Sequence, residues 1–271
     1  MTLFQAVALG IAQGVTEFLP ISSDGHLWVV YRAFGDTPDL TFEIFLHFAT
    51  LLVLIVYFRR DLAHLLASLL PANRGRRTER RLLGLIAVGT FVSGAIALLM
   101  GNAVEAANAS AVLVALGFLL TACLMFAAEL LSARVTRIAE AGDLPLSRAI
   151  LIGVLQALAV LPGVSRSGST ISAGMLSGLD RERAARFSFL LGIPIIALAT
   201  AKDAFDVVTG TSALPSRGPA LAGFAAALVA GYLAIWGLLG FLRRHRLYWF
   251  AAYTAVLGTA ILVYETVVAR G

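Results

Sequence analysis

A stretch near the N-terminus gathers polar side chains in an otherwise apolar segment. Gln13 and Glu17 are four residues apart, so a helix would place both on one face. Pro20 is expected to end that helix in a bend that carries two hydroxyls, a carboxylate and an imidazole: Ser22, Ser23, Asp24 and His26. An acid and a base within an apolar segment favour a catalytic site. Ser22 fits a helix cap and a site equally well.

A second polar stretch follows Pro162 and Gly163 and opens another apolar segment. It contains four hydroxyls, one guanidinium and one glycine: Ser165, Arg166, Ser167, Gly168, Ser169 and Thr170. Hydroxyls, backbone N–H groups beside glycine and a helix N-terminus all bind anions, and a guanidinium matches two phosphate oxygens. An arginine that snorkels to an interface normally stands at the end of a long span. We therefore interpret this stretch as a phosphate site.

His47 is a further polar residue inside an apolar stretch. Its imidazole could line a cavity or hydrogen-bond to a neighbouring helix, and the sequence leaves both open. The histidines His64 and His245 lie in basic loops, where contact with lipid headgroups is the simpler interpretation.

The composition places these polar stretches in a membrane. The chain has 271 residues, of which 59% are hydrophobic and 14% charged, and its mean hydropathy is +0.87. A soluble fold of this length cannot bury that much apolar surface. The net charge of +5 is then explained by basic loops rather than by nucleic acid. A single cysteine, Cys123, excludes a disulfide framework.

Six apolar stretches have roughly the 20 residues that a membrane-spanning helix requires. They are Thr41–Phe58, Leu82–Met100, Ala111–Leu131, Phe187–Ala204, Pro219–Leu242 and Leu247–Val268. Two more apolar regions, Leu3–Tyr31 and Ala149–Leu179, are interrupted by the two polar stretches. Each is expected to form a re-entrant pair of half-length helices, because bends at membrane depth need a protein or watery environment. The predicted fold is an all-α integral membrane protein with six transmembrane helices and two re-entrant broken pairs.

The arginines predict an orientation. Most of them lie in four connections that would share one side of the membrane: Arg59–Arg81, Ser132–Arg148, Arg181–Arg186 and Arg243–Arg246. The excess of positive charge places this side in the cytoplasm and both termini outside.

The two halves also resemble each other. At an offset of 143 residues, identical residues recur at Gly10 and Gly153, Gln13 and Gln156, Ser22 and Ser165, and Gly25 and Gly168. Each half has one broken region and three spans, so the second half would lie inverted relative to the first. We expect a single polytopic domain, 1–271, with repeats of about 1–131 and 148–268 and a site where the broken helices meet.

The two polar stretches together resemble the paired signatures of bacterial undecaprenyl-diphosphate phosphatases, also known as bacitracin-resistance proteins. The likeness rests on Gln13-xxx-Glu17-Phe-Leu-Pro-Ile-Ser-Ser-Asp-Gly-His26 and on Pro162-Gly-Val-Ser-Arg166-Ser-Gly-Ser-Thr170. It implies hydrolysis of undecaprenyl diphosphate to undecaprenyl phosphate and inorganic phosphate. That reaction recycles the lipid carrier of peptidoglycan and other envelope glycans at the outer face of the bacterial inner membrane. The implied partners are a polyprenyl diphosphate and membrane lipids but no nucleic acid, and a homodimer is left open.

The candidate site residues receive complementary roles under this hypothesis. The diphosphate would be held by hydroxyls and a guanidinium: Ser22, Ser165, Arg166, Ser167 and Thr170. Glu17, with Gln13 and Asp24, would bind Mg²⁺ or Ca²⁺ or act as a base. His26 and Ser23 compete as the nucleophile, His26 is also a candidate general acid, and water is a third candidate for the attack.

A transporter or flippase for a polyprenyl phosphate or another anion is the rival interpretation. Inverted repeats with broken helices are common in secondary transporters, and fold alone does not decide between the two. Glu17 and His26 would then relay protons, and Arg166 would anchor the substrate.

Overall fold

The computed structural model describes residues 1–70, 75–108, 110–210 and 216–268, and within these ranges the chain forms helices and no strand. Six helices are long and apolar enough to cross a membrane, as the sequence predicts. They are α3 (Leu40–Tyr57), α5 (Arg77–Asn108), α6 (Ala111–Leu131), α9 (Arg181–Val208), α10 (Arg217–Leu242) and α11 (Tyr248–Val263). The all-α membrane fold is thereby confirmed.

The first interrupted region forms two short helices, α1 (Leu3–Phe18) and α2 (Ser23–Phe34). At 1.5 Å per residue they are about 24 and 18 Å long, less than a hydrocarbon core of about 30 Å. Leu19 leaves the helical conformation just before Pro20, as a residue that precedes proline tends to do. Ser22 has a φ of 72° and caps α2 by accepting a hydrogen bond from the Gly25 N–H.

The second interrupted region has the same plan. It comprises α7 (Leu146–Ala157), a 3₁₀ turn at Leu158–Val160, and α8 (Arg166–Leu176). Gly163, with a φ of 78°, takes the left-handed conformation that glycine adopts readily. A side chain there would also collide with the backbone of Val114 on α6.

Two spanning helices are longer than the apolar stretches predicted for them, because charged turns continue them. The α5 helix begins at Arg77 rather than Leu82, and α9 begins at Arg181 rather than Phe187. The expected loop after α3 also contains a helix of its own, α4 (Arg59–Ala67). Short 3₁₀ turns at Ser132–Arg134 and Ala141–Asp143 lead to α7, and a π-helical turn at Tyr264–Val268 ends the described chain.

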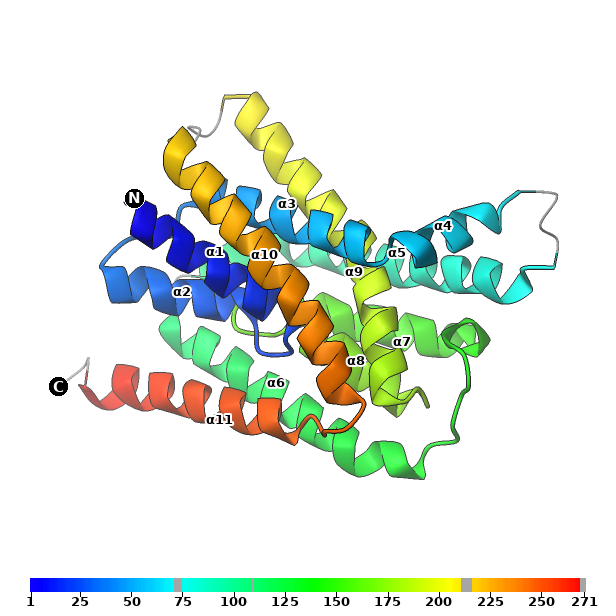
Figure 1. The fold of residues 1–271 in the computed structure, drawn as a ribbon. Helices are drawn as coiled ribbons and strands as arrows, with labels where there is room; N and C mark the ends of the chain where they lie inside the picture. The colour runs from blue at the N-terminus through cyan, green and yellow to red at the C-terminus, as the bar shows by residue number, and fades with distance from the viewer. Residues whose placement is uncertain (71–74, 109, 211–215, 269–271) are drawn as a thin grey trace.

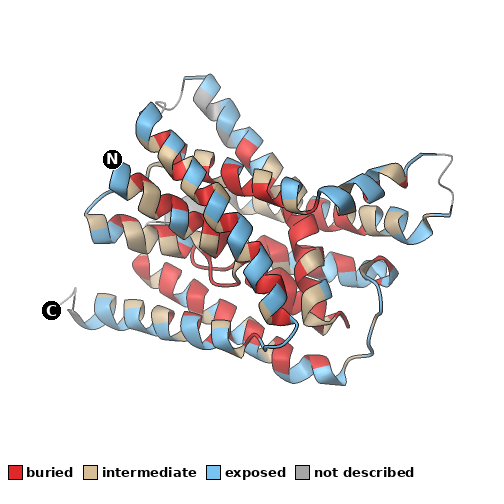
Figure 2. Ribbon diagram, viewed as in Figure 1, coloured by how far each residue is buried: buried red, intermediate tan, exposed pale blue. Residues whose placement is uncertain are grey.

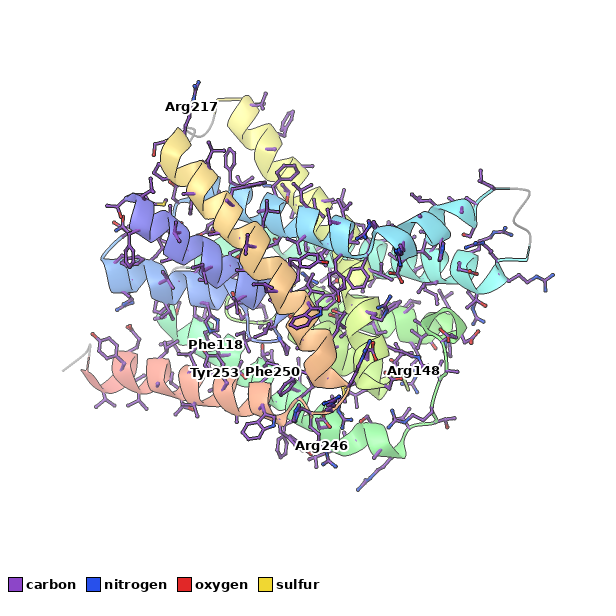
Figure 3. All side chains as sticks on the ribbon, in the orientation of Figure 1. Phe118, Arg148, Arg217, Arg246, Phe250 and Tyr253 are labelled. Carbon is purple, nitrogen blue, oxygen red and sulfur yellow. The ribbon has the colours of Figure 1, made fainter. Side chains whose placement is uncertain are left out.

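The connections divide between two ends of the bundle. In Figure 1 the N-terminus and the α2–α3 connection lie at the left, whereas the α6–α7 connection lies at the lower right and the α10–α11 connection at the lower middle. Figure 3 shows Arg148 at the lower right, Arg246 at the lower middle and Arg217 at the upper left. The arginine-bearing connections after α6 and α10 thus lie away from the N-terminus in this view.

Buried residues concentrate where α8 and α9 cross the middle of the molecule, and the outer faces of α10 and α11 are exposed (Figure 2). These exposed faces are apolar: Trp236 and Trp249 are 67% and 69% exposed. Such surfaces suit lipid tails rather than water. The interior of the bundle is therefore formed by the short helices, such as α8, and by the spanning helices that pack against them, such as α9.

Candidate functional site

A polar cavity of about 200 Å³ lies where the two bends approach each other. Five of the site residues predicted from the sequence line this cavity, and they come from both polar stretches: Glu17, Ser23, Asp24, Ser165 and Arg166. Residues of α3, α5, α7 and α9 complete the wall. Side chains from separate halves of the chain thus share one small space.

Glu17 is the centre of the hydrogen bonding in this cavity. Its Oε1 accepts from Arg166 Nη2 at 2.7 Å, and its Oε2 accepts from Ser23 Oγ at 2.7 Å. Gln13 Nε2 donates to the same Oε2 at 3.1 Å from one turn earlier in α1. Both Glu17 and Gln13 are buried, so a charged carboxylate here depends on these partners. The end of α1 thereby joins the starts of α2 and α8.

Arg166 is the first residue of α8, and its guanidinium crosses the cavity to Glu17. Gly192 of α9 lies against the guanidinium so closely that a β-carbon at this position would collide with Nη1. Arg166 Nη1 is buried and has no hydrogen-bond partner. An arginine with one nitrogen on a carboxylate and another free can bind an anion without leaving its ion pair.

Three hydroxyls of the second polar stretch hold the bend, and of these only Ser165 also lines the cavity. Ser165 Oγ caps α8 by accepting from the Gly168 N–H at 3.0 Å, although Ser165 also lines the cavity. Ser167 Oγ donates to the carbonyl of Leu19 at 3.0 Å and so ties the two bends together. Thr170 Oγ1 donates to the Arg166 carbonyl at 2.8 Å. Ser167 and Thr170 are not among the cavity residues, and neither is Ser22, the cap of α2.

His26 lies on another side of α2 and is not among the cavity residues. Its Nδ1 donates to the Ser22 carbonyl at 2.7 Å, which leaves Nε2 to accept from the Tyr253 hydroxyl at 2.8 Å. The imidazole stacks on Tyr253, and the ring of Phe118 meets it edge-on. Figure 3 shows Phe118 and Tyr253 in the region between α6 and α11. The structure therefore separates His26 from the Glu17 and Arg166 pair.

Five other polar residues line the cavity, and one of them, Thr16, donates its hydroxyl to the Ala12 carbonyl. His47 Nε2 of α3 lies 4.0 Å from Glu17 Oε2, while its Nδ1 donates to the Glu43 carbonyl. Gln156 donates to Ser93 Oγ at 2.8 Å, and Thr200 stands on α9. His47 and Gln156 had sequence signals, an imidazole in an apolar span and the repeat of Gln13. Ser93 and Thr200 had none, because single hydroxyls in apolar helices are common.

The oxygen atoms around Glu17 suit a hard divalent cation. Asp24 adds a second carboxylate to the cavity, and Gln13 Oε1 is a buried oxygen without a hydrogen-bond partner. Carboxylate and amide oxygens are the ligands that Mg²⁺ and Ca²⁺ prefer. The described residues contain no ready group of three His, Cys, Asp or Glu side chains around one point. A cation here would therefore need oxygen atoms from the substrate as well.

Comparison with known proteins gives full-length matches. The profile of the family described as "Bacitracin resistance protein BacA" matches residues 6–260. A protein of Gemmatimonas aurantiaca named undecaprenyl-diphosphatase is 42% identical over 100% of both chains. Proteins of the same name from Mycobacterium sp. (strain KMS) and Methanosphaera stadtmanae are 38% and 34% identical. Those matches cover 97% and 98% of this chain and 96% and 99% of the relatives.

Proposed function

The chain belongs to the BacA family of bacitracin resistance proteins, and from this membership we propose that it is an undecaprenyl-diphosphatase. It hydrolyses undecaprenyl diphosphate to undecaprenyl phosphate and inorganic phosphate, and so returns the lipid carrier to envelope glycan synthesis. The observation that carries the proposal within the molecule is the ion pair of Glu17 and Arg166 in a cavity built from both bends. Transport is not favoured, because the relatives are named for hydrolysis.

Arg166 binds the diphosphate and stabilises the charge that develops during phosphoryl transfer. The ion pair with Glu17 supports this role, because it holds the guanidinium among the residues that line the cavity. The position at the start of α8 adds the partial positive charge of a helix N-terminus. Ser165 contributes at the rim of the same site. Ser167, Thr170 and Ser22 act by fixing the bends, which is what their hydrogen bonds support.

Ser23 is the nucleophile in the mechanism that we favour, and Glu17 is its base. The Ser23 hydroxyl donates to Glu17 at 2.7 Å, the arrangement that activates a weak nucleophile. Ser23 Oγ attacks the terminal phosphorus and passes its proton to Glu17. The bond from that phosphorus to the bridging oxygen breaks, and undecaprenyl phosphate leaves. Glu17 gives its proton to the departing undecaprenyl phosphate. Water then attacks the phosphoserine and passes a proton to Glu17. The bond from phosphorus to Ser23 Oγ breaks, Glu17 returns that proton to Oγ, and inorganic phosphate is released.

The place of His26 in the reaction is then indirect. Both ring nitrogens have partners outside the cavity, Ser22 and Tyr253. This supports a role in holding the start of α2, from which Ser23 projects, rather than in attack on phosphorus. Direct attack by water on the diphosphate, with Glu17 as base, is the remaining alternative to Ser23.

A divalent cation, Mg²⁺ or Ca²⁺, would be held by Glu17, Asp24 and Gln13 and would neutralise charge on the phosphate oxygens. The donor types support this assignment. His47 beside Glu17 would share in setting the charge of the same corner.

We also propose that the two broken pairs are re-entrant and that the halves are inverted repeats. The packing supports this, because α1 lies against α10 in the same way that α7 lies against α5. Under the repeat, α1 corresponds to α7 and α10 to α5. The α6 and α11 helices, which correspond to each other, also pack together.

The orientation follows from the same plan. The end with the arginine-bearing connections faces the cytoplasm by the positive-inside rule, and the termini lie outside. The cavity then opens toward the outer face of the bacterial inner membrane, where the diphosphate is produced.

The test is phosphate release by the purified protein in detergent, where transport has no meaning because no compartments exist. We expect release from undecaprenyl diphosphate, and a nearly complete loss in Glu17→Ala and Arg166→Ala. A matched control is the exposed pair of Glu182 and Arg243, also at 2.7 Å, whose alanine variants should retain turnover. Normal turnover in folded Glu17→Ala or Arg166→Ala protein would refute the proposed site.

A further inference from the structure

An apolar groove of about 710 Å³ runs along the outer side of α5 and α9. It is lined by side chains of these helices and of α4, among them Phe91, Gly94, Leu98, Ile193, Pro194 and Leu198. Phe91 and Leu98 are 76% and 82% exposed. Its lining on α5 extends from Leu83 to Leu98, a rise of about 22 Å at 1.5 Å per residue. The groove is therefore long and apolar, which suits an extended hydrocarbon chain.

The groove and the polar cavity are lined by different residues of the same two helices. On α5 the cavity is lined by Ser93 and Ala97, and the groove is lined by their sequence neighbours Gly94 and Leu98. The α9 helix shows the same alternation, and there Pro194 on the groove side precedes Ile195 on the cavity side. The seam where Gly94 of α5 faces Ile195 of α9 joins a groove residue to a cavity residue.

The seam is built from residues that leave it open. Gly94 on α5 has no side chain, and a β-carbon there would find Ile195 Cδ1 as its nearest neighbour at 3.9 Å. Pro194 lies inside α9 and cannot donate the backbone hydrogen bond of a regular helix. Proline in a helix interior kinks or loosens it locally. The two helices therefore meet loosely at the level of the cavity.

We propose that this groove binds the isoprenoid tail of the substrate while its diphosphate occupies the polar cavity, with the prenyl chain passing between α5 and α9 beside Gly94. The inference rests on the proposed function. It identifies the part of the protein that recognises a long polyprenyl chain rather than a diphosphate alone.

Two other apolar grooves compete for the tail and fit less well. The groove between α1, α10 and α11 shares only α1 with the polar cavity. The groove between α6 and α11 shares neither helix with it. When the headgroup occupies the cavity, the tail must leave through a wall of the cavity. The α5–α9 groove shares two wall helices with the cavity, α5 and α9.

Gly94→Phe tests the passage. The variant places a ring at the seam, and a β-carbon is sterically accepted there. Gly237→Phe is the matched control, since Gly237 lines the α10 groove and its β-carbon would meet nothing within 4 Å. Initial rates are measured with undecaprenyl diphosphate and with isopentenyl diphosphate, which has one isoprene unit and no long tail.

We expect Gly94→Phe to lower the ratio of kcat/KM for undecaprenyl diphosphate over isopentenyl diphosphate on the order of tenfold, a typical effect of altered pocket shape. Gly237→Phe should keep the wild-type ratio. An unchanged ratio in Gly94→Phe, or an equal fall in Gly237→Phe, overturns the tail assignment while the enzyme remains a diphosphatase. A wild-type protein that cleaves neither substrate overturns the proposed function instead.

A second measurement does not depend on turnover. An undecaprenyl diphosphate analogue with a benzophenone in its chain should crosslink to the peptide that contains Phe91 and Leu98. Crosslinking to peptides with Leu233 or Trp249, which line the groove between α1, α10 and α11, would place the tail in that groove and overturn the inference.

Discussion

Gly192→Ala is expected to displace the guanidinium of Arg166 although Arg166 itself is not mutated. Gly192 lies in the middle of α9, and a β-carbon there would collide with Nη1 and Cζ of Arg166. The neighbour is the end of a flexible side chain, so the guanidinium can move while both helices stay in place. The variant therefore displaces Arg166 from its position over Glu17 and leaves the fold intact.

The magnitude follows from the geometry. The ion pair of Arg166 Nη2 and Glu17 Oε1 is 2.7 Å long, and a shift of about 1 Å in a positioned group costs on the order of 100-fold in rate. Alanine is also favoured over glycine in a helix interior by about 1 kcal/mol. We expect kcat/KM to fall about 100-fold while the melting temperature stays equal or rises.

The assay is phosphate release from undecaprenyl diphosphate, with thermal unfolding followed in the same detergent. Gly240→Ala is the control, because a β-carbon at Gly240 of α10 meets nothing within 4 Å. It should show the gain in stability without the loss of activity. Wild-type kcat/KM in folded Gly192→Ala protein would show that the exact position of Arg166 does not matter and would refute the reasoning.

Three further outcomes follow from the site and its surroundings. Ser23→Ala should lower kcat on the order of 1,000-fold, and adding Glu17→Gln to it should cost little more, because residues that act as one unit are not additive; losses that multiply in this kinetic cycle would show that the two act independently. Asp24→Asn should raise the Mg²⁺ concentration for half-maximal rate after EDTA treatment about tenfold, and an unchanged requirement would remove Asp24 from the cation site. Arg181→Ala should destabilise the fold by about 2 kcal/mol, because it leaves the buried carboxylate of Glu129 with the Leu247 N–H as its remaining hydrogen-bond donor. The loss is smaller than for the breaking of a fully buried ion pair, because Arg181 is partly exposed. An unchanged midpoint in thermal or denaturant unfolding would contradict this.

Hydropathy predicted the spans because membrane helices must satisfy their own backbone and bury apolar side chains. It underestimated α5 and α9, where arginines at the start still belong to the helix. Arg186, for example, pairs with Asp61 at 2.7 Å and also lies over the ring of Phe58. Partners from other parts of the chain, which no hydropathy window contains, stabilise these turns. The α4 helix was missed for a related reason, since it begins with three charged residues, Arg59, Arg60 and Asp61.

The sequence singled out polar residues of which the structure places five in one cavity, but it did not predict the direction of each side chain. Glu17 and Arg166, 149 residues apart, were expected to act together because acid and guanidinium each stood at a bend, and the structure joins them. The sequence could not tell which hydroxyls would face the cavity. Ser22 and Ser23 are adjacent, yet one caps α2 and the other binds Glu17. Which serine caps α2 depends on the backbone at Ser22. Its φ of 72° cannot be predicted from the residue type.

The proposed repeat gives this choice a physical reason. At the offset of 143 residues, Ser22 corresponds to Ser165 and Ser23 to Arg166. Ser22 and Ser165 do the same work, since each caps the helix that follows it. Ser23 and Arg166 are the first residues of those helices, and both hydrogen-bond to Glu17. One architecture thus directs two equivalent positions at the same carboxylate, a hydroxyl that can attack phosphorus on one side and a guanidinium that can hold its oxygens on the other. The catalytic asymmetry lies in which side chain occupies each position.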